Sequence, residues 1–239
     1  MRLVKRLINN AVEAFGYEIF RKVKDNSLFG LERFPIKTIL DIGANRGQFA
    51  RRALSVFPDA KIFCFEPLPA PLKELENWSK VDPRVFPCPV ALGAESGEVT
   101  MHLTLDQDDS SSMLKITENC VKTYPVTGRQ ATAVVKQSTL DEFMTSPEMK
   151  GGVAPELLIK VDVQGYEPNV IRGGAATFGR ARAAILEVCI DDLYEGQASF
   201  KQIFSLMDGM GFVYKGNLEQ GRAADGHVTY FDAVFIKER

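Results

Sequence analysis

The chain alternates short apolar runs with amphipathic stretches, an order that predicts parallel strands joined by helices. Predominantly apolar runs are typical of strands buried on both faces of a sheet. Here they are 38–42, 61–65, 157–161 and 183–190. In the amphipathic stretches apolar residues recur every three or four positions, which is the spacing of a helix face. These stretches are 49–57, 69–80 and 200–210.

Two regions depart from this alternation. The run Val85–Leu92 contains two prolines, and because proline cannot donate to a sheet ladder we expect an edge or bulged strand there. The insert that follows contains two β-rich segments, 98–105 and 131–136, which we expect to pair antiparallel. A polar, serine-rich run at 106–112 lies between them.

The C-terminal part closes the sheet with two more strands, 212–214 and 230–236, separated by a turn-forming stretch with several glycines. Together these elements predict a Rossmann-like α/β fold. We expect a seven-stranded, mostly parallel sheet with an antiparallel last strand, and a β insert after the third strand. The chain is most simply one domain over 35–239, preceded by an extension over 1–34.

The N-terminal extension contains a segment suited to packing on a surface. Between residues 2 and 15, apolar residues recur at helical spacing while Arg2, Lys5 and Arg6 lie off that stripe, which predicts a basic amphipathic helix. Such a helix packs on its own domain or on a second subunit of a homodimer, or lies peripherally on the inner face of a membrane. The segment lacks the continuous apolar core and the cleavage site of a signal peptide.

Composition narrows the classes of partner and compartment. The net charge of −2 provides no positive field for nucleic acid. The four cysteines lack metal-type spacing, and most lie in apolar runs where a free thiol behaves as a small hydrophobe. We therefore expect a cytoplasmic protein. No apolar stretch approaches the roughly 18 residues that a membrane span requires.

The first apolar run leads into a glycine-punctuated turn, Asp41–Gln48, that opens the first helix. Gly43 and Gly47 supply the conformational freedom that lets backbone approach a ligand at the carboxyl edge of a parallel sheet. The spacing is not that of a dinucleotide fingerprint, which needs glycine where Asn45 stands. The carboxylate of Asp41 would repel phosphate and attract an ammonium group. The turn therefore favours a zwitterionic ligand that carries a nucleoside.

Glu66 lies one strand–helix unit later, at the carboxyl end of the run 61–65, where Pro67 stops the strand. Nucleotide-binding folds place at this point the acid that accepts hydrogen bonds from the ribose hydroxyls. A helix cap or an exposed surface residue is the alternative. The glycine turn upstream favours the ribose assignment.

Asp162 is a candidate for the chemistry. It ends the buried run 157–161, and because parallel strands end at one edge of a sheet, we expect it beside the Gly43 turn. A carboxylate that caps the following helix is the alternative. Glu167, directly before a proline, suits that role better.

Glu187 is a second candidate because it interrupts the apolar run 183–190. Burying an unpaired carboxylate is costly, so a partner must exist. Lys160, Arg172, a helix N-terminus, a metal or substrate hydroxyls would each serve. Directly after the run stand two further acids, Asp191 and Asp192.

Six motifs in this order resemble the FkbM family of S-adenosylmethionine-dependent methyltransferases. They are DIGANRGQ (41–48), FEP (65–67), VALG (90–93), STLD (138–141), IKVDVQGYE (159–167) and LEV (186–188). Each motif alone is weak, and the ordered set, from about Pro35 to the C-terminus, is specific. The resemblance implies a class I methyltransferase sheet, S-adenosylmethionine as cofactor, and O-methylation of sugars, glycolipids, polysaccharides or natural products.

The resemblance also extends the candidate site. In the family a serine-containing loop lies near the cofactor, which implies a role for Ser111 and Ser112, although their residue types are equally typical of a solvated loop. The full set expected to bind the cofactor is Asp41, Gly43, Ala44, Asn45, Gly47, Gln48, Glu66, Ala91, Leu92, Ser111, Ser112 and Asp162.

The catalytic candidates are Asp162, Glu187 and His227. Histidine has an ordinary pKa suited to a base near neutrality, although a lone loop histidine is usually exposed. Related small-molecule O-methyltransferases bind Mg²⁺ with acids at the ends of these two strands. Asp162 with Asp191 or Asp192 would form such an oxygen-rich site, and acids that cap a helix or face solvent are the alternative.

We therefore expect an O-methyltransferase that acts on a hydroxyl of a sugar unit in a glycan, glycolipid or glycosylated metabolite. An acid-rich rim that repels phosphates and carboxylates favours this substrate class, as does the absence of the D-P-P-Y sequence of base methyltransferases. The alternatives are methylation of a non-sugar hydroxyl, carboxylate or nitrogen, and a catalytically idle nucleoside-binding module.

Overall fold

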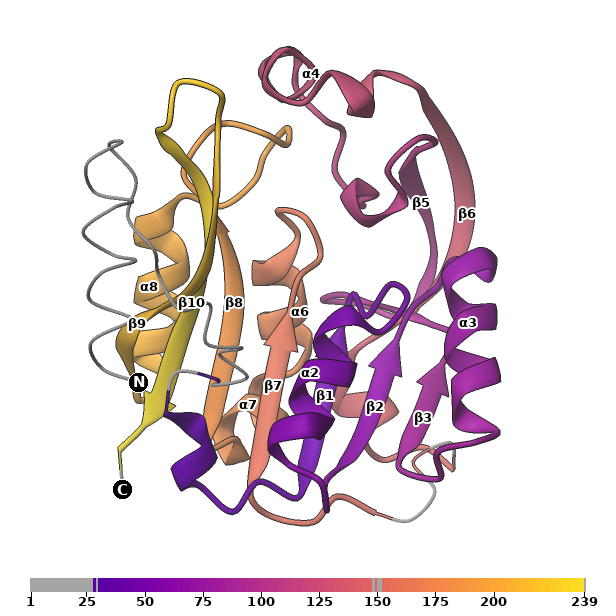
Figure 1. The fold of residues 1–239 in the computed structure, drawn as a ribbon, viewed down its shortest axis with the longest axis vertical. Helices are drawn as coiled ribbons and strands as arrows, with labels where there is room; N and C mark the ends of the chain where they lie inside the picture. Colours follow the sequence, from indigo (N-terminus) through magenta and orange to yellow (C-terminus); the bar gives the residue numbers. More distant parts are fainter. Residues whose placement is uncertain (1–27, 29, 148, 150–151, 239) are drawn as a thin grey trace, which may run out of the picture.

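The computed structural model describes residues 28, 30–147, 149 and 152–238, so the segment predicted as an amphipathic helix at 2–15 lies outside the described residues. A seven-stranded sheet forms the centre, in the order β3-β2-β1-β7-β8-β10-β9 (Figure 1). Its strands are β1 (Thr38–Ile42), β2 (Lys61–Phe65), β3 (Val85–Cys88), β7 (Leu157–Val161), β8 (Ala183–Cys189), β9 (Phe212–Arg222) and β10 (Val228–Lys237).

The direction of the strands is as predicted. β1 pairs in parallel with β2 and β7, β3 continues beyond β2, and β8 continues beyond β7. β10, the last strand of the chain, runs antiparallel to β8 and to β9. The carboxyl ends of the parallel strands therefore meet at one edge, where open α/β sheets bind their ligands.

Helices cover both faces of the sheet and create two separate apolar cores. The core on one face is formed with α2 (Gln48–Val56) and α3 (Pro69–Ser79). The core on the other face is formed with α5 (Leu140–Phe143), α6 (Glu167–Gly173), α7 (Ala175–Arg180) and α8 (Phe200–Gly209). The strands at the centre are buried on both faces, which explains their continuous apolar runs.

The short helix η1 (Leu31–Arg33) joins the first of these cores. Leu28 and Leu31 are fully buried there, against the same cluster that contains Val234 and Ile236 of β10. The apolar core therefore includes residues that precede position 35, where the domain was expected to begin.

The insert forms a second sheet in the order β4-β6-β5, with β4 (Ala91–Leu92), β5 (Gly97–Thr104) and β6 (Gln130–Ser138). The predicted antiparallel pairing of β5 with β6 is confirmed. Between them lie η2 (Asp108–Ser110), α4 (Glu118–Thr123) and η3 (Pro125–Gly128). The insert rises beyond the carboxyl ends of the parallel strands (Figure 1).

The third strand is an edge strand, as predicted, but it is shorter than the predicted run Val85–Leu92. β3 ends at Cys88 and forms the outer edge of the large sheet, while β4 pairs in parallel with β6 of the insert. Pro87 and Pro89 explain this division, because neither can donate to a ladder. The chain thereby leaves one sheet and enters the other next to Glu66, whose backbone N–H donates to the Cys88 carbonyl at 3.1 Å.

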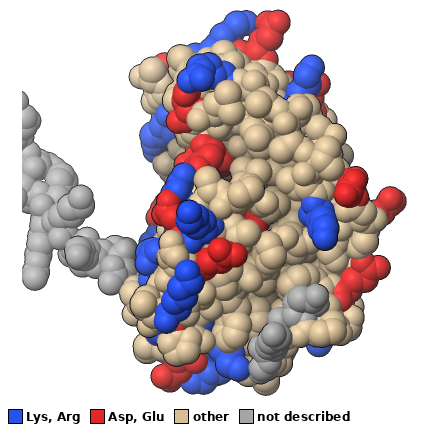
Figure 2. Space-filling view, turned by 90° about the vertical axis from the view of Figure 1, so that its right-hand side faces the viewer, with Lys and Arg blue, Asp and Glu red and all other residues tan. Residues whose placement is uncertain are grey.

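The two C-terminal strands are longer than predicted. β9 is the other edge of the large sheet, and its second half is mostly polar and partly exposed. An edge strand in solvent carries no apolar periodicity, so the sequence pattern ends before the strand does. Within the described part of the chain, no helix is long and apolar enough to span a membrane. Figure 2 shows one face of the molecule, on which the Lys and Arg side chains of the described residues are interspersed with Asp and Glu side chains.

Candidate active site

The glycine turn after β1 is shaped by its packing against the segment after β7. Gly43 and Gly47 both have φ of 81°, and Asn45 between them has φ of 43°. A Cβ on Gly43 would lie 1.8 Å from the carbonyl oxygen of Asp162, so only glycine fits. The sequence predicted that Gly43 lets the backbone approach a ligand closely. In the structure the group that lies close to Gly43 is the backbone carbonyl of Asp162. Gly47 begins α2 and lies under Leu75 and Trp78 of α3.

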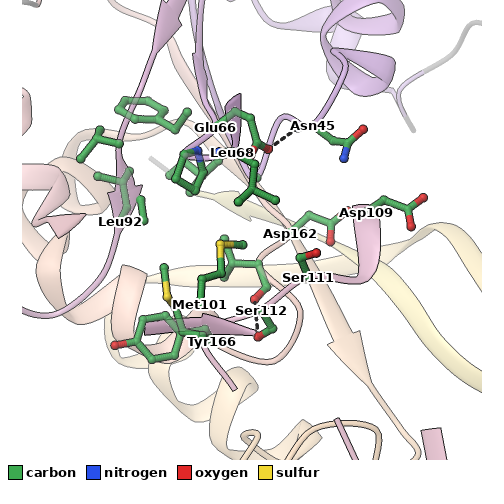
Figure 3. Close-up of a pocket in the computed structure, with 18 of the residues that line it drawn as sticks. Asn45, Glu66, Leu68, Leu92, Met101, Asp109, Ser111, Ser112, Asp162 and Tyr166 are labelled. Carbon is green, nitrogen blue, oxygen red and sulfur yellow. Dashed lines mark hydrogen bonds between the residues drawn. The ribbon is translucent and has the colours of Figure 1, made fainter. Parts of the chain in front are cut away.

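Glu66 lies at the end of β2 and faces this turn. Its carboxylate accepts hydrogen bonds from the backbone N–H of Asn45 at 3.0 Å and of Leu68 at 2.8 Å (Figure 3). Burial raises the pKa of Glu66 to about 7, although these two hydrogen bonds favour its charged form. Each oxygen keeps lone-pair capacity for a further donor.

Glu66 lines a first cavity that is otherwise mainly apolar. Figure 3 shows Glu66 and Leu68 on one side, with Met101, Ser112 and Tyr166 on the other. The apolar lining includes Ile42, Phe65, Leu68, Val90, Ala91, Leu92, Met101, Met113 and Val163. A mainly apolar slot with the Glu66 carboxylate in its wall suits a flat heteroaromatic group attached to a sugar with vicinal hydroxyls.

Ser111 and Ser112 also line this cavity and are buried, with exposures of 7% and 1%. The Ser112 hydroxyl donates to the backbone carbonyl of Gln164 at 2.7 Å. The Ser111 hydroxyl accepts from the backbone N–H of Thr104 at 3.2 Å. These serines therefore form part of the site, whereas their residue types alone were equally typical of a solvated loop.

Asp108 fastens the insert to the glycine turn. Its carboxylate accepts from the Asn45 side-chain amide at 3.2 Å and from the Arg46 guanidinium at 2.6 Å. Arg46 also pairs with Glu74 of α3. The turn, the insert and α3 are thereby joined at the rim of the first cavity.

A second cavity, of about 320 Å³, opens on the other side of the turn. Asp41 lies in its wall, and one carboxylate oxygen, Oδ2, is buried without a hydrogen-bond partner. Burial raises the pKa of Asp41 to about 7, and the charge of Lys160 opposes that shift. A buried oxygen without a partner, on a residue that lines a cavity, marks a position that a donor would satisfy. Further lining residues include Ala44, Gln48, Phe49, Lys160 and Asp232.

A third cavity lies between the sheet edge and the insert. Its polar wall contains Glu187, Gln164 and Asp232, and its aromatic wall contains Tyr124, Tyr194 and Tyr230. Asp162 and Asp109 line all three cavities. The two carboxylates therefore mark the point where the three spaces meet.

The charges around Asp162 hold it ionised. The buried ammonium of Lys160 lies 2.9 Å from Asp162 Oδ2 and 3.4 Å from Asp232 Oδ1. Although burial opposes ionisation, the Lys160 charge and hydrogen bond keep the pKa of Asp162 below its ordinary value. Burial also opposes the charge on Lys160, and the two carboxylates more than compensate, so the pKa of Lys160 is raised.

Glu187 has the opposite character. Burial, followed by the neighbouring charge of Asp162, raises the pKa of Glu187 well above its ordinary value. Its Oε2 accepts a hydrogen bond at 2.8 Å from the side-chain amide of Gln164, which is thus its direct partner. Of the partners weighed from sequence, Lys160 acts through its charge, whereas Arg172 donates to Asn169 instead.

His227 lies outside the three cavities. Its ring is half exposed and lies between Asp191, at 2.9 Å from Nε2, and Asp225, at 2.5 Å from Nδ1. The hydrogen bond to Asp191, followed by that to Asp225, raises the pKa of His227. Asp191 is therefore paired with His227, and the side chain of Asp192 is exposed.

A Mg²⁺ site of Asp162 with Asp191 or Asp192, considered from sequence as a possibility, stays untested. Among the described residues, no group of three or more His, Cys, Asp or Glu side chains is arranged to hold a metal ion. Asp162 is instead bound by Lys160 and Gln164.

The structure brings most of the predicted residues together. Of the twelve expected to bind the cofactor, only Gly47 lines none of the three cavities, and it acts by starting α2. Sequence reasoning missed Gln164, Asp232 and Tyr194, and included Asp109 only as a member of the acid-rich rim. Gln164 carried one signal, its place between the strand-end acid and a glycine. Asp232 carried none, because it faces Glu187 only through the pairing of β10 with β8.

Comparison with known proteins finds relatives among methyltransferases. The methyltransferase FkbM domain model matches residues 41–214. The 2-O-methyltransferase NoeI of Sinorhizobium fredii is 32% identical over 185 residues, which cover 75% of this chain and 74% of that protein. The crystal structure of methyltransferase FkbM from Methylobacillus flagellatus KT matches with a TM-score of 0.50 at 11% identity, covering 87% of this chain. This chain spans 45% of the length of that one, and the likeness concerns the fold alone.

Proposed function

This chain belongs to the FkbM family of S-adenosylmethionine-dependent methyltransferases, and on that premise we propose that it methylates a hydroxyl of a sugar unit in a glycan, glycolipid or glycosylated metabolite. The observation that carries the proposal is the meeting of three cavities at Asp162, one mainly apolar, one with an orphaned carboxylate oxygen, and one rich in hydrogen-bonding groups. The first cavity suits the nucleoside of S-adenosylmethionine, the second suits its amino-acid end, and the third suits the acceptor.

The residues present fit the cofactor. Glu66 has free lone pairs for the ribose hydroxyls, and the apolar slot around Leu92 and Met101 suits adenine. The partnerless oxygen of Asp41 suits an ammonium group in the second cavity. When bound, S-adenosylmethionine supplies a methyl group made electrophilic by its positively charged sulfur.

Asp162 is the residue best suited to receive the acceptor's proton. It is ionised near neutrality and lines the third cavity as well as the first two. As the acceptor oxygen bonds to the methyl carbon, the methyl–sulfur bond would break and neutral S-adenosylhomocysteine would leave. The hydroxyl proton passes to the Asp162 carboxylate and then to solvent, so charge and atoms balance. The protein's larger contributions are alignment and exclusion of water.

Two observations support a neutral hydroxyl as the acceptor. The residues that line the third cavity include Asp109, Glu187 and Asp232 but no Lys, Arg or His, so an anionic phosphate or carboxylate would find no counter-charge in its wall. Carboxylates accept hydrogen bonds from vicinal hydroxyls, and the tyrosines offer flat apolar faces. The name of the relative in Sinorhizobium fredii, a 2-O-methyltransferase, also supports transfer to oxygen.

The proposal is tested by turnover of the purified protein with deuterium-labelled S-adenosylmethionine and a panel of acceptors. The panel contains free sugars, glycolipids and glycosylated metabolites, with carboxylic acids and amines as competing classes. Mass spectrometry is expected to find labelled methyl ethers on sugar hydroxyls. Labelled esters or N-methyl products without any sugar ether would overturn the acceptor class. Cofactor binding without turnover on any acceptor would favour the idle module.

A further inference from the structure

The side chain of Gln164 joins two of the carboxyls that line the third cavity, those of Asp162 and Glu187. Its Nε2 donates hydrogen bonds to Asp162 Oδ1 and to Glu187 Oε2, each at 2.8 Å. Its Oε1 accepts from the Tyr194 hydroxyl. Both N–H groups and one lone pair of the amide are therefore used, each toward a group that lines the same cavity.

The backbone of Gln164 is held in a conformation that its residue type does not favour. Its φ is 58°, in the left-handed region that costs a non-glycine residue of the order of 1 kcal/mol or more. The hydroxyl of Ser112 donates to its carbonyl, and Gly165 beside it is tightly packed against Tyr194 and Gln197. The insert and the loop after β8 thus both contact the Gln164–Gly165 segment and hold it in place; these contacts are called the clamp below.

The clamp determines how Asp162 is oriented. One carboxylate oxygen of Asp162 is held by the Gln164 amide and the other by the Lys160 ammonium at 2.9 Å. Hydrogen bonds at both oxygens restrain the rotation of the carboxylate, whose oxygens can accept more than one hydrogen bond each. The second N–H of the same amide sets the position of Glu187 relative to Asp162.

We propose that Gln164 is a positioning residue for methyl transfer, which acts by holding the Asp162 carboxylate at the junction of the cavities while keeping Glu187 in register with it. This inference rests on the proposed role of Asp162 as the proton acceptor. It is independent of whether the acceptor proves to be a sugar.

The test is a double-mutant cycle with Asp162→Asn and Gln164→Met. Methionine has a similar length and removes the three side-chain hydrogen bonds. Turnover is measured on an acceptor that the panel above yields. In the wild-type background Gln164→Met is expected to lower kcat roughly 10- to 100-fold with little change in the KM for S-adenosylmethionine. In the Asp162→Asn background the same change should alter kcat by less than about threefold, because Gln164 acts through Asp162.

Gln197→Met is the matched control. Gln197 makes three hydrogen bonds as well, accepting from the backbone N–H of Leu193 and Tyr194 and donating to the carbonyl of Asp191. It supports the same loop without contacting the carboxyls, and methionine keeps the Cβ that packs against Gly165. We expect it to lower the melting temperature while leaving kcat within about twofold.

An acceptor-free readout keeps the inference testable if turnover is absent. Carbon-13 NMR of labelled aspartate, with S-adenosylhomocysteine bound and Asp162→Asn to assign the signal, follows the Asp162 carboxyl directly. Loss of the Gln164 donor should raise the pKa of Asp162, and Gln197→Met should not.

If Gln164→Met fails to fold, Tyr194→Phe removes the hydroxyl that donates to the Gln164 amide oxygen. This variant should lower kcat a few-fold in the wild-type background only. Equal losses in both backgrounds, or an unmoved Asp162 signal, would overturn the proposal.

Discussion

At the scale of single residues, Asp162 and Glu187 are two carboxyls whose surroundings separate their pKa values. Asp162 adjoins the buried ammonium of Lys160, whereas Glu187 is buried beside the charge of Asp162 itself. Such a pair provides one charged and one neutral carboxyl near neutrality. The charged group can accept a proton or a hydrogen bond, and the neutral one can donate a hydrogen bond.

Glu66 provides the test of the ribose assignment. Glu66→Ala removes both acceptor oxygens and should weaken the binding of S-adenosylhomocysteine by about 1.5–3 kcal/mol, the range for hydrogen bonds to a charged group, or roughly 10- to 100-fold in Kd. Isothermal titration calorimetry measures the change. Glu74→Ala on α3, which removes the exposed partner of Arg46, should leave Kd within a few-fold. An unchanged Kd in the Glu66 variant would contradict the assignment.

At the scale of elements, the contact between the Gly43 turn and the segment after β7 brings the two halves of the site together. Gly43→Ala should destabilise the protein by more than about 2 kcal/mol, because the new Cβ meets the Asp162 carbonyl and φ is 81°. Urea unfolding measures this. Gly179→Ala, in α7 with open space around it, should be neutral or stabilising by up to about 1 kcal/mol. Equal effects at the two glycines would show that the contact is dispensable.

The start of α6 contains a buried carboxyl whose state depends on pH. Glu167 Oε1 accepts from the backbone N–H of Val163 at 3.1 Å and of Gly165 at 3.2 Å, and burial raises the pKa of Glu167 to about 7 from its ordinary 4.5. The folded protein therefore binds this proton more tightly than the unfolded chain. The resulting stability is complete below about pH 4.5 and is lost as the pH rises through about 7.

Glu167→Gln tests this linkage. A glutamine oxygen can accept the same two hydrogen bonds and has no charge to bury, so the variant should gain stability relative to wild type as the pH rises from 5 to 8. The gain should reach about 3 kcal/mol at most, from 1.36 kcal/mol per pKa unit. Denaturant unfolding at several pH values measures it, with the exposed Glu76→Gln on α3 as control. A difference that does not vary with pH would refute the linkage.

At the scale of the whole molecule, the first cavity is built jointly by the central sheet and the insert. S-adenosylhomocysteine at 100 times its Kd should raise the free energy of unfolding by about 2.7 kcal/mol. Hydrogen exchange should slow both in the turn after β1 and in β5 with the segment that follows it, since residues from both line the cavity. Amides of α8, which contributes no lining residue to this cavity, should be unaffected. Protection confined to the turn would show that the insert takes no part in binding.

The sequence by itself determined the elements whose signals are local. Continuous apolar runs predicted the central strands, and the prolines predicted a disturbed third strand, although not that the chain would leave one sheet for another. The rule that parallel strands end at one edge of the sheet predicted from sequence alone that Asp41, Glu66 and Asp162 lie at the same edge. These inferences succeed because they depend on neighbours in the chain or on one general property of parallel sheets.

Only the tertiary structure decided what depends on distant contacts. Ser112 is buried because its hydroxyl reaches the carbonyl of Gln164, and Asp232 enters the site because β10 pairs with β8 in one register. His227 lies outside the cavities, where it is hydrogen-bonded to Asp191 and Asp225. Gln164 joins two carboxyls because a left-handed backbone directs its amide between them. Each outcome is set by atoms far apart in the sequence, and no local pattern of residue types records such contacts.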